Sequence, residues 1–152
     1  ITKKGKSIRC KVDQIRPTGR QSQGVRGMKL GKDDVIIGMA LIEGTLKKED
    51  FYILTATENG FAKRSDIEEY RLQSRGGKGI INIKVSSKIG DAKGAILVQD
   101  IDEVMCITQK GILIRSKIKD IRASGRSTQG VKIINLESGD RLSTIARIVP
   151  EE

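Results

Sequence analysis

The same pattern of 29 residues occurs three times in this chain, and the three copies align without a gap. Each copy begins Thr-x-x-Gly, and the copies cover residues 2–30, 57–85 and 108–136. Their first glycines are Gly5, Gly60 and Gly111, spaced 55 and 51 residues apart. A second glycine follows at position +19 from the first, and a β-branched residue follows it. The spacing is close to that of propeller blades, roughly 40–50 residues, and predicts a stack of similar units.

Arginine recurs at three fixed positions of the pattern, counted from the first glycine. The +4 set is Arg9, Arg64 and Arg115, the +11 set is Arg16, Arg71 and Arg122, and the +15 set is Arg20, Arg75 and Arg126. A turn uses glycine where φ is positive, but it does not require arginine. Because duplex DNA carries one phosphate charge per ~1.7 Å of axis, regularly spaced cations on a rigid scaffold suit its backbone. The alternative is that the +4 and +11 arginines pair across strands with acids such as Asp66, Glu68, Glu69 and Asp120.

Short apolar runs rich in β-branched residues indicate an all-β chain. Residues 50–57 and 102–109 lead into the Thr-x-x-Gly turns, and 60–65 and 111–116 follow as the second strands of hairpins. Residues 79–85 and 130–136 are expected to form third strands, and 94–99 and 143–149 fourth strands. We therefore predict about three four-stranded, propeller-like blades. The best helical candidate is the short stretch 65–73.

The repeat boundaries predict one repeat domain over residues 1–152. The expected blades cover approximately 1–42, 51–98 and 102–149, with a linker at 43–50 and an acidic tail at 150–152. The first blade is expected to be incomplete at its N-terminal side, because only Ile1 precedes the first Thr-x-x-Gly.

The charge of the chain favours a polyanionic partner. The net charge is +10 and the pI is about 9.8. Aromatic residues make up only 3%, which is few for a protein that stacks unpaired bases, and no recognition helix is evident. We therefore expect sequence-independent binding of duplex DNA, which must bend if the blades form an arc. No apolar run approaches the roughly 20 residues of a membrane span, so no membrane partner is expected.

The sequence gives no sign of catalytic or metal chemistry. The chain has no histidine, and Cys10 and Cys106 stand far apart, so neither a metal site nor a disulfide is expected. "GKS" at 5–7 has no upstream glycine and "RGGKG" at 75–79 has no Ser or Thr after its lysine, so neither is a P-loop. We expect no catalytic residue, no cofactor and no small-molecule substrate in this domain.

Four segments resemble a known family. "QSRGGKG" (73–79) resembles the gyrase-A box Q-R-R-G-G-[KR]-G, with Ser74 in place of an arginine. "TATENGFAKRSDIEEY" (55–70), "GRSTQGVKIINL" (125–136) and "GVRGMKLGKDD" (24–34) resemble the DNA-wrapping C-terminal domains of the DNA gyrase A family. The A subunits of topoisomerase IV are the nearest competing relatives. The resemblance implies a β-pinwheel, in which propeller-like blades exchange a strand with their neighbours.

The resemblance also implies a function and a set of contacts. It implies a non-catalytic part of an ATP-dependent type II topoisomerase that introduces negative supercoils, with ATP and Mg used elsewhere in the holoenzyme. The implied partners are duplex DNA, the remaining gyrase A domains and the gyrase B subunit, in the cytoplasm at the nucleoid. The residues implied to touch DNA, besides the loops 19–24 and 125–130, are Gln73, Arg75, Gly76, Gly77, Lys78 and Gly79. Open alternatives are a propeller-like protein-interaction scaffold, a topoisomerase IV-type domain and an RNA-binding β-repeat.

Overall fold

The fold is known from a computed structural model that describes residues 1–44 and 50–150. The regular structure of these residues consists of nine β-strands in three antiparallel sheets, with three single-turn 3₁₀ helices. The expected all-β class is therefore confirmed. The 3₁₀ turns are η1 (Val12–Gln14), η3 (Ile67–Glu69) and η4 (Ile118–Asp120).

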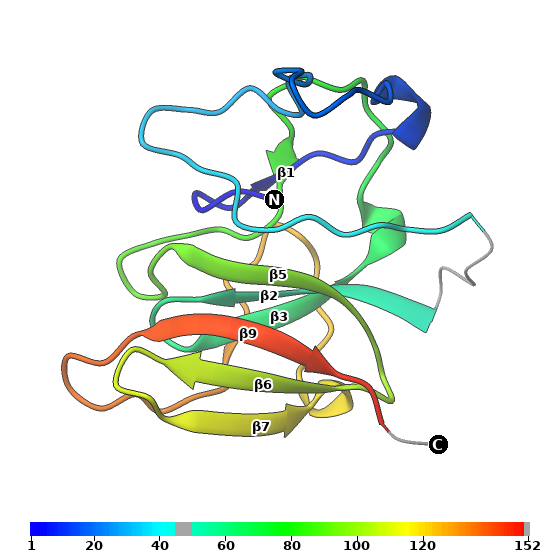
Figure 1. Ribbon diagram of the computed structural model, residues 1–152. Helices are drawn as coiled ribbons and strands as arrows, with labels where there is room; N and C mark the ends of the chain where they lie inside the picture. Colours follow the sequence, from blue (N-terminus) through cyan, green and yellow to red (C-terminus); the bar gives the residue numbers. More distant parts are fainter. Residues whose placement is uncertain (45–49, 151–152) are drawn as a thin grey trace.

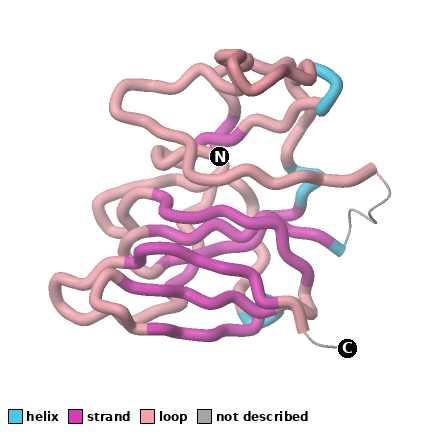
Figure 2. The backbone as a smooth tube through the Cα atoms, in the orientation of Figure 1, coloured by secondary structure: helices cyan, strands magenta, loops and turns pink. Residues whose placement is uncertain are grey.

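The second and third sheets each contain one hairpin and strands from its surroundings, while the first sheet pairs two short strands from different repeats. The first sheet has the order β1 (Lys6–Ser7), β4 (Ile80–Ile81). The second has the order β5 (Ala92–Gln99), β2 (Phe51–Thr57), β3 (Phe61–Asp66), β8 (Val131–Lys132). The third has the order β7 (Leu113–Lys117), β6 (Glu103–Thr108), β9 (Leu142–Ile148). Figure 1 shows the second and third sheets as successive layers, with the first repeat above them. Figure 2 shows that this uppermost layer is mostly loop.

The two Thr-x-x-Gly motifs of the later repeats close β-hairpins, as predicted. In β2–β3, Gly60 N–H donates to Thr57 O at 3.1 Å, and in β6–β7, Gly111 N–H donates to Thr108 O at 3.1 Å. Both glycines have positive φ, +80° and +84°. This conformation costs a residue with a side chain roughly 1–2 kcal/mol, so glycine is the fitting residue.

Neighbouring repeats exchange a strand. β4, from the second repeat, pairs with β1 of the first, and β8, from the third repeat, pairs with β3 of the second. The exchange implied by the resemblance is present. The expectation that 79–85 and 130–136 add strands to their own blades is wrong. Since their ladders are only two residues long, the apolar pattern could not show which blade they join.

The first glycine of a repeat makes the exchange possible. Gly60 O accepts hydrogen bonds from Ile133 N–H and Ile134 N–H of the next repeat, at 2.9 and 3.2 Å. A Cβ at Gly60 would lie only 2.7 Å from Ile134 O. Gly5 O accepts hydrogen bonds from Asn82 N–H and Ile83 N–H in the same way, at 2.8 and 3.2 Å. Glycine is therefore needed here for close approach as well as for positive φ.

The expected helix at 65–73 is limited to the single turn η3. The Asp66 side chain caps it by accepting Glu68 N–H at 2.8 Å. Tyr70 returns to extended backbone, with φ −95° and ψ 92°, and the chain leaves for the junction with the first repeat. The same geometry recurs at η4, which ends at the extended residue Ile121.

The largest apolar core lies between the second and third sheets. Leu54, Val98, Val104 and Leu142 are each fully buried in it. The two sheets meet at Gly94 of β5, where a Cβ would lie 2.6 Å from Ile145 Cγ1 of β9. A small residue at this point lets the inner strands of successive blades pack against each other.

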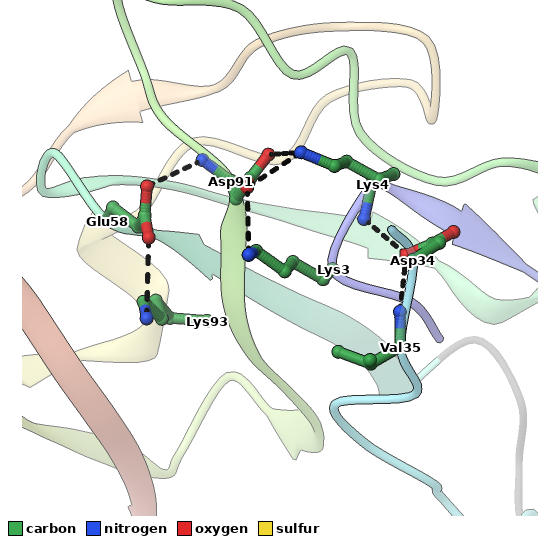
Figure 3. A network of polar contacts seen from close by, with 7 residues as sticks. All are labelled: Lys3, Lys4, Asp34, Val35, Glu58, Asp91 and Lys93. Carbon is green, nitrogen blue, oxygen red and sulfur yellow. Dashed lines mark hydrogen bonds and ion pairs between the residues drawn. The ribbon is translucent and has the colours of Figure 1, made fainter. Parts of the chain in front are cut away.

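A charged network joins the first repeat to the second at the turn end of the blades (Figure 3). Lys4 Nζ lies 3.0 and 3.1 Å from the two carboxylate oxygens of Asp91, and Lys3 Nζ lies 3.5 Å from one of them. Glu58 holds the segment from the other side by accepting Asp91 N–H at 3.2 Å. Burial alone would raise the pKa of Asp91, but the hydrogen bonds and charges of Lys4 and Lys3 lower it below its usual value.

Candidate nucleic-acid interface

The +4 arginines fasten one repeat to the next. Arg9 Nη1 donates to Ile67 O at 2.9 Å and to Tyr70 O at 3.1 Å, where η3 of the second repeat ends. Arg64 Nε donates to Ile121 O at 2.7 Å, the equivalent carbonyl after η4 of the third repeat. Tyr70 O and Ile121 O lie at the ends of η3 and η4, where carbonyls lack an intrahelical partner, so the arginines satisfy them; Ile67 O also accepts Tyr70 N–H at 3.2 Å.

Two arginines of this set form ion pairs with acids, as the alternative interpretation proposed. The acids are not Asp66, Glu68, Glu69 or Asp120. Arg64 also forms an ion pair with Asp100, and its side chain is only 11% exposed. Arg115 pairs with Glu103 on the neighbouring strand β6, with a side chain that is 60% exposed. Whether Arg9, Arg64 and Arg115 meet DNA stays a prediction.

The +15 arginine of the second repeat reaches back onto the first. Arg75 N–H donates to Gln14 Oε1 at 2.7 Å, and Arg75 Nε donates to Gln14 O at 3.0 Å. Its Nη1 donates to Arg26 O at 2.5 Å. Three hydrogen bonds thus hold residues 73–79, called the box loop below, against the preceding blade.

The +15 arginine of the third repeat makes the equivalent contacts on the second. Arg126 N–H donates to Glu69 Oε2 at 2.9 Å, and Nη1 donates to Ile81 O at 2.7 Å. The guanidinium carbon lies 5.9 Å from the centre of the Tyr70 ring. Glu69 and Ile81 occupy the repeat positions of Gln14 and Arg26. The recurring arginine therefore has a structural role that the spacing alone did not reveal, and its contact with DNA stays a prediction.

The box glycines also serve the junction. Gly76 N–H donates to Gly27 O at 2.8 Å, and Gly77 O accepts Lys29 N–H at 2.8 Å. At Gly79, with φ +70°, a Cβ would lie 3.0 Å from the carbonyl carbon of Ser7. The backbone amides of Arg75 and Gly76 are thus bonded within the chain and are not open to a phosphate.

Gln73 and Lys78 occupy different environments in the box. Gln73 N–H donates to Arg9 O at 2.8 Å, while its side-chain Nε2 is buried without a partner in residues 1–44 and 50–150. Lys78 is exposed, and its ammonium forms no hydrogen bond or ion pair with a described residue. Lys78 is thus the box cation that remains open to a ligand.

The +11 arginines are the set that the fold leaves open. Arg16, Arg71 and Arg122 are exposed, and their side chains have no hydrogen bond or ion pair with any residue that the structure describes. Arg71 stands next to Leu72, which forms a parallel bridge with Arg9 of the first repeat. Arg122 stands next to Ala123, which bridges Arg64 in the same way.

Arg71 and Arg122 therefore lie at equivalent places beside the two blade junctions, and Arg16 occupies the same position of the first repeat. Arg20 is also exposed, without a partner among the described residues.

Two lysines at position +24 were not predicted from the sequence. Lys29 and Lys84 are exposed, and their backbone N–H groups donate to Gly77 O at 2.8 Å and to Thr128 O at 3.0 Å of the following repeat's loop. The signal was their recurrence at one position of the first two repeats. They add a cation to each loop junction.

Within the described residues, no helix is long and apolar enough to cross a membrane.

Comparison with known proteins agrees with this repeat structure. A family model described as "DNA gyrase C-terminal domain, beta-propeller" matches residues 1–43, 52–99 and 102–148. The DNA gyrase A protein of Mycolicibacterium smegmatis is 40% identical over 154 residues, which is 100% of this chain and 18% of that protein. The DNA gyrase A protein of Neisseria gonorrhoeae is 40% identical over 138 residues, 91% of this chain and 15% of that protein. The chain thus spans less than a fifth of the length of these relatives.

Solved structures show the same arrangement of strands. A DNA gyrase A C-terminal domain superposes with a TM-score of 0.85 at 26% identity, over 98% of this chain and 49% of the other. A DNA topoisomerase IV C-terminal domain gives 0.89 at 24% identity, over 98% of this chain and 45% of the other, a likeness of fold.

Proposed function

This chain belongs to the family of DNA gyrase C-terminal domains, and from that premise we propose that it binds duplex DNA without sequence preference and wraps it. It does so as a non-catalytic part of an ATP-dependent type II topoisomerase that introduces negative supercoils. Its partners are the remaining gyrase A domains and the gyrase B subunit, at the nucleoid in the cytoplasm. ATP and Mg act in those other parts.

The exposed +11 arginines support the proposal most directly. Arg16, Arg71 and Arg122 occupy one position of the repeat, and repeats are joined by recurring bonds. A duplex that contacts one of them therefore meets the next in a similar orientation at the following blade. Lys29 and Lys84 lie at the same junctions and extend the positive surface.

Such a surface favours wrapping over base readout. Within the described residues, the structure has no α-helix to enter a major groove. Cations at successive, rotated blades hold phosphates along a curved path, and the deformation of the duplex is offset by the added contacts. The net charge of +10 supplies long-range attraction.

The salt dependence of duplex binding tests the proposal. The slope of log K against log salt is negative, and each phosphate contact contributes ~0.9 to its magnitude. The variant Arg16→Gln/Arg71→Gln/Arg122→Gln loses three contacts and is expected to reduce that magnitude by ~2.7.

The matched control is Lys32→Gln/Lys88→Gln/Lys110→Gln, which removes the same charge outside the +11 positions. Equal slopes for the two variants would contradict the assignment of the interface. A protein-interaction scaffold would show weak duplex binding that does not tighten as the duplex lengthens.

A further inference from the structure

Positions +3 and +9 of the repeat are two of those at which the two blade junctions differ. At position +3 the first repeat has Ile8 and the second has Lys63, and at position +9 they have Gln14 and Glu69. The side chain of Ile8 lies beside the box loop, since a Cβ at Gly77 would be 3.6 Å from Ile8 Cδ1. An apolar residue and a neutral amide thus support the loop that carries Arg75.

At the second junction the same place holds a buried ammonium group. Lys63 is 0% exposed. Its Nζ donates to Gly125 O and to Arg126 O, both at 2.7 Å, and to Ser65 Oγ at 3.0 Å. All three hydrogens of the ammonium have acceptors, and two of these acceptors belong to the loop that carries Arg126.

An acidic side chain, that of Glu69, contacts the same loop as this lysine. Glu69 Oε2 accepts Arg126 N–H at 2.9 Å, where the neutral Gln14 accepts Arg75 N–H at 2.7 Å in the first junction. The pair Lys63 and Glu69 has the same net charge as the pair Ile8 and Gln14. The first junction shows that a neutral pair supports this kind of loop.

The fold does not require a charge at this place, and charge burial is costly. Taking an ammonium group out of water is costly, and bonds to neutral acceptors offset that cost only in part. Lys63 therefore supplies the Arg126 loop with two hydrogen bonds rather than with added net charge, because Glu69 balances its charge. Arg126 Nε is buried without a partner among the described residues, whereas Arg75 Nε donates to Gln14 O at 3.0 Å, so the bonds from Lys63 hold the third-repeat loop where that contact is missing.

We propose that Lys63 is a positioning residue for duplex binding, which together with Glu69 holds the loop that carries Arg126 in the place where it meets phosphate. This inference rests on the proposed function. It makes the two loops different: phosphate binding at the Arg126 loop depends on the protonation of Lys63, while binding at the Arg75 loop does not.

The groups around the Lys63 ammonium set the pH at which it loses its proton. Burial lowers the pKa of Lys63 to about 8, the negative charge of Glu69 on η3 raises it, and the positive charge of Arg126 lowers it. Tyr70, next to η3, stays neutral because burial raises its pKa. Lys63 is therefore largely charged at about pH 7 and largely neutral at about pH 9.5. A neutral amine has two hydrogens for three acceptors, so deprotonation also loosens the loop.

Stability and binding then change in opposite directions with pH. The pKa of Lys63 is about 8 in the folded chain and about 10.4 in the unfolded chain. Between these values the unfolded state binds more protons, so folding stability rises as pH rises. Duplex affinity falls over the same range because the neutral amine can no longer bond all three acceptors and holds Arg126 less firmly. A residue that only supports the fold would change the stability with pH and leave the duplex affinity of the folded chain unchanged.

The test compares the wild-type chain with Lys63→Ile/Glu69→Gln, which copies the first junction. Unfolding by urea and binding of a fluorescent duplex are measured at about pH 7 and about pH 9.5. At the lower pH we expect the double variant to be at least as stable as wild type. We expect the magnitude of its salt slope for duplex binding to be smaller by about 0.9, the value of one phosphate contact, because Arg126 is no longer held by the bonds from Lys63.

The change with pH completes the test. At the higher pH the wild-type slope should fall to that of the double variant, whose own slope stays constant. Equal slopes for both proteins at both pH values would overturn the role of Lys63 while leaving the proposed function intact. Failure of the wild-type chain to bind duplex at either pH would overturn both.

Discussion

Replacing Gly60 by alanine tests the idea that successive blades are joined through the first glycine of each repeat. A Cβ at Gly60 would lie 2.7 Å from Ile134 O and 3.3 Å from Ile134 Cβ, both in the next repeat. Gly111 occupies the same position one repeat later, with φ +84° against +80°, and a Cβ there meets nothing within 4 Å. Other atoms approach Gly60 closely and do not approach Gly111, while the two glycines have nearly the same backbone conformation.

The expected costs follow from that difference. Positive φ costs alanine roughly 1–2 kcal/mol at both sites, and the reduced freedom of the unfolded chain offsets about 0.4–1 kcal/mol at both. Overlap with a backbone oxygen that cannot move independently adds about 1–3 kcal/mol at Gly60 alone. Gly60→Ala should therefore be about 2 kcal/mol less stable than Gly111→Ala. In a domain of this size that is about 4–8 °C in Tm.

Urea unfolding of the wild type and of the two variants measures the free energies, with Tm as a second readout. The exchange of β8 into the second sheet should be weakened only in Gly60→Ala, so amide hydrogen exchange of Ile133 and Ile134 should rise in that variant alone. Equal destabilisation of the two variants would refute the reasoning, because positive φ would then explain the whole effect.

Three further outcomes are expected. Asp91→Asn should cost under about 1 kcal/mol near neutral pH. Since Lys4 and Lys3 lower the pKa of Asp91 in the folded chain, its contribution is lost as pH falls below about 4, and the variant should lose less stability than wild type in an acid titration. Tyr70→Phe should cost about 1–3 kcal/mol in urea unfolding, because the hydroxyl donates to buried Asn82 Oδ1 at 2.6 Å; an unchanged midpoint would contradict that bond. Burial raises the pKa of Cys106 to about 11, so a thiol reagent at about pH 8 should label half-buried Cys10 and leave Cys106 unreacted, and rapid native labelling of both would be the contrary result.

The parts of the fold that the sequence predicted are those with a local signature. The hairpins β2–β3 and β6–β7 follow from β-branched runs on either side of Thr-x-x-Gly, since the glycine must adopt positive φ. Their partners β5 and β9 followed from similar runs.

The exchanged strands β4 and β8 are different. Each pairs over only two residues with a strand of the preceding repeat, far away in sequence. An apolar pattern carries no information about so distant a partner, so the sequence predicted the strands without their place in the sheets.

The arginines show why a site is harder to predict than a hairpin. Spacing identified Arg9, Arg64, Arg75 and Arg126 as special, but their partners are mostly backbone carbonyls. Every residue has a carbonyl, so such a partner leaves no trace in the sequence. Only the fold separates the arginines that fasten blades from those that remain exposed.

The most direct test of wrapping is the linking number that the chain imposes on DNA. The protein is titrated onto nicked circular DNA, the nick is ligated, the protein is removed and the topoisomers are resolved on a gel. We predict a shift in linking number that grows with protein and disappears in Arg16→Gln/Arg71→Gln/Arg122→Gln, while Lys32→Gln/Lys88→Gln/Lys110→Gln retains it. Tight, salt-sensitive binding with no shift, or an unchanged shift in the arginine variant, would contradict wrapping by these exposed arginines.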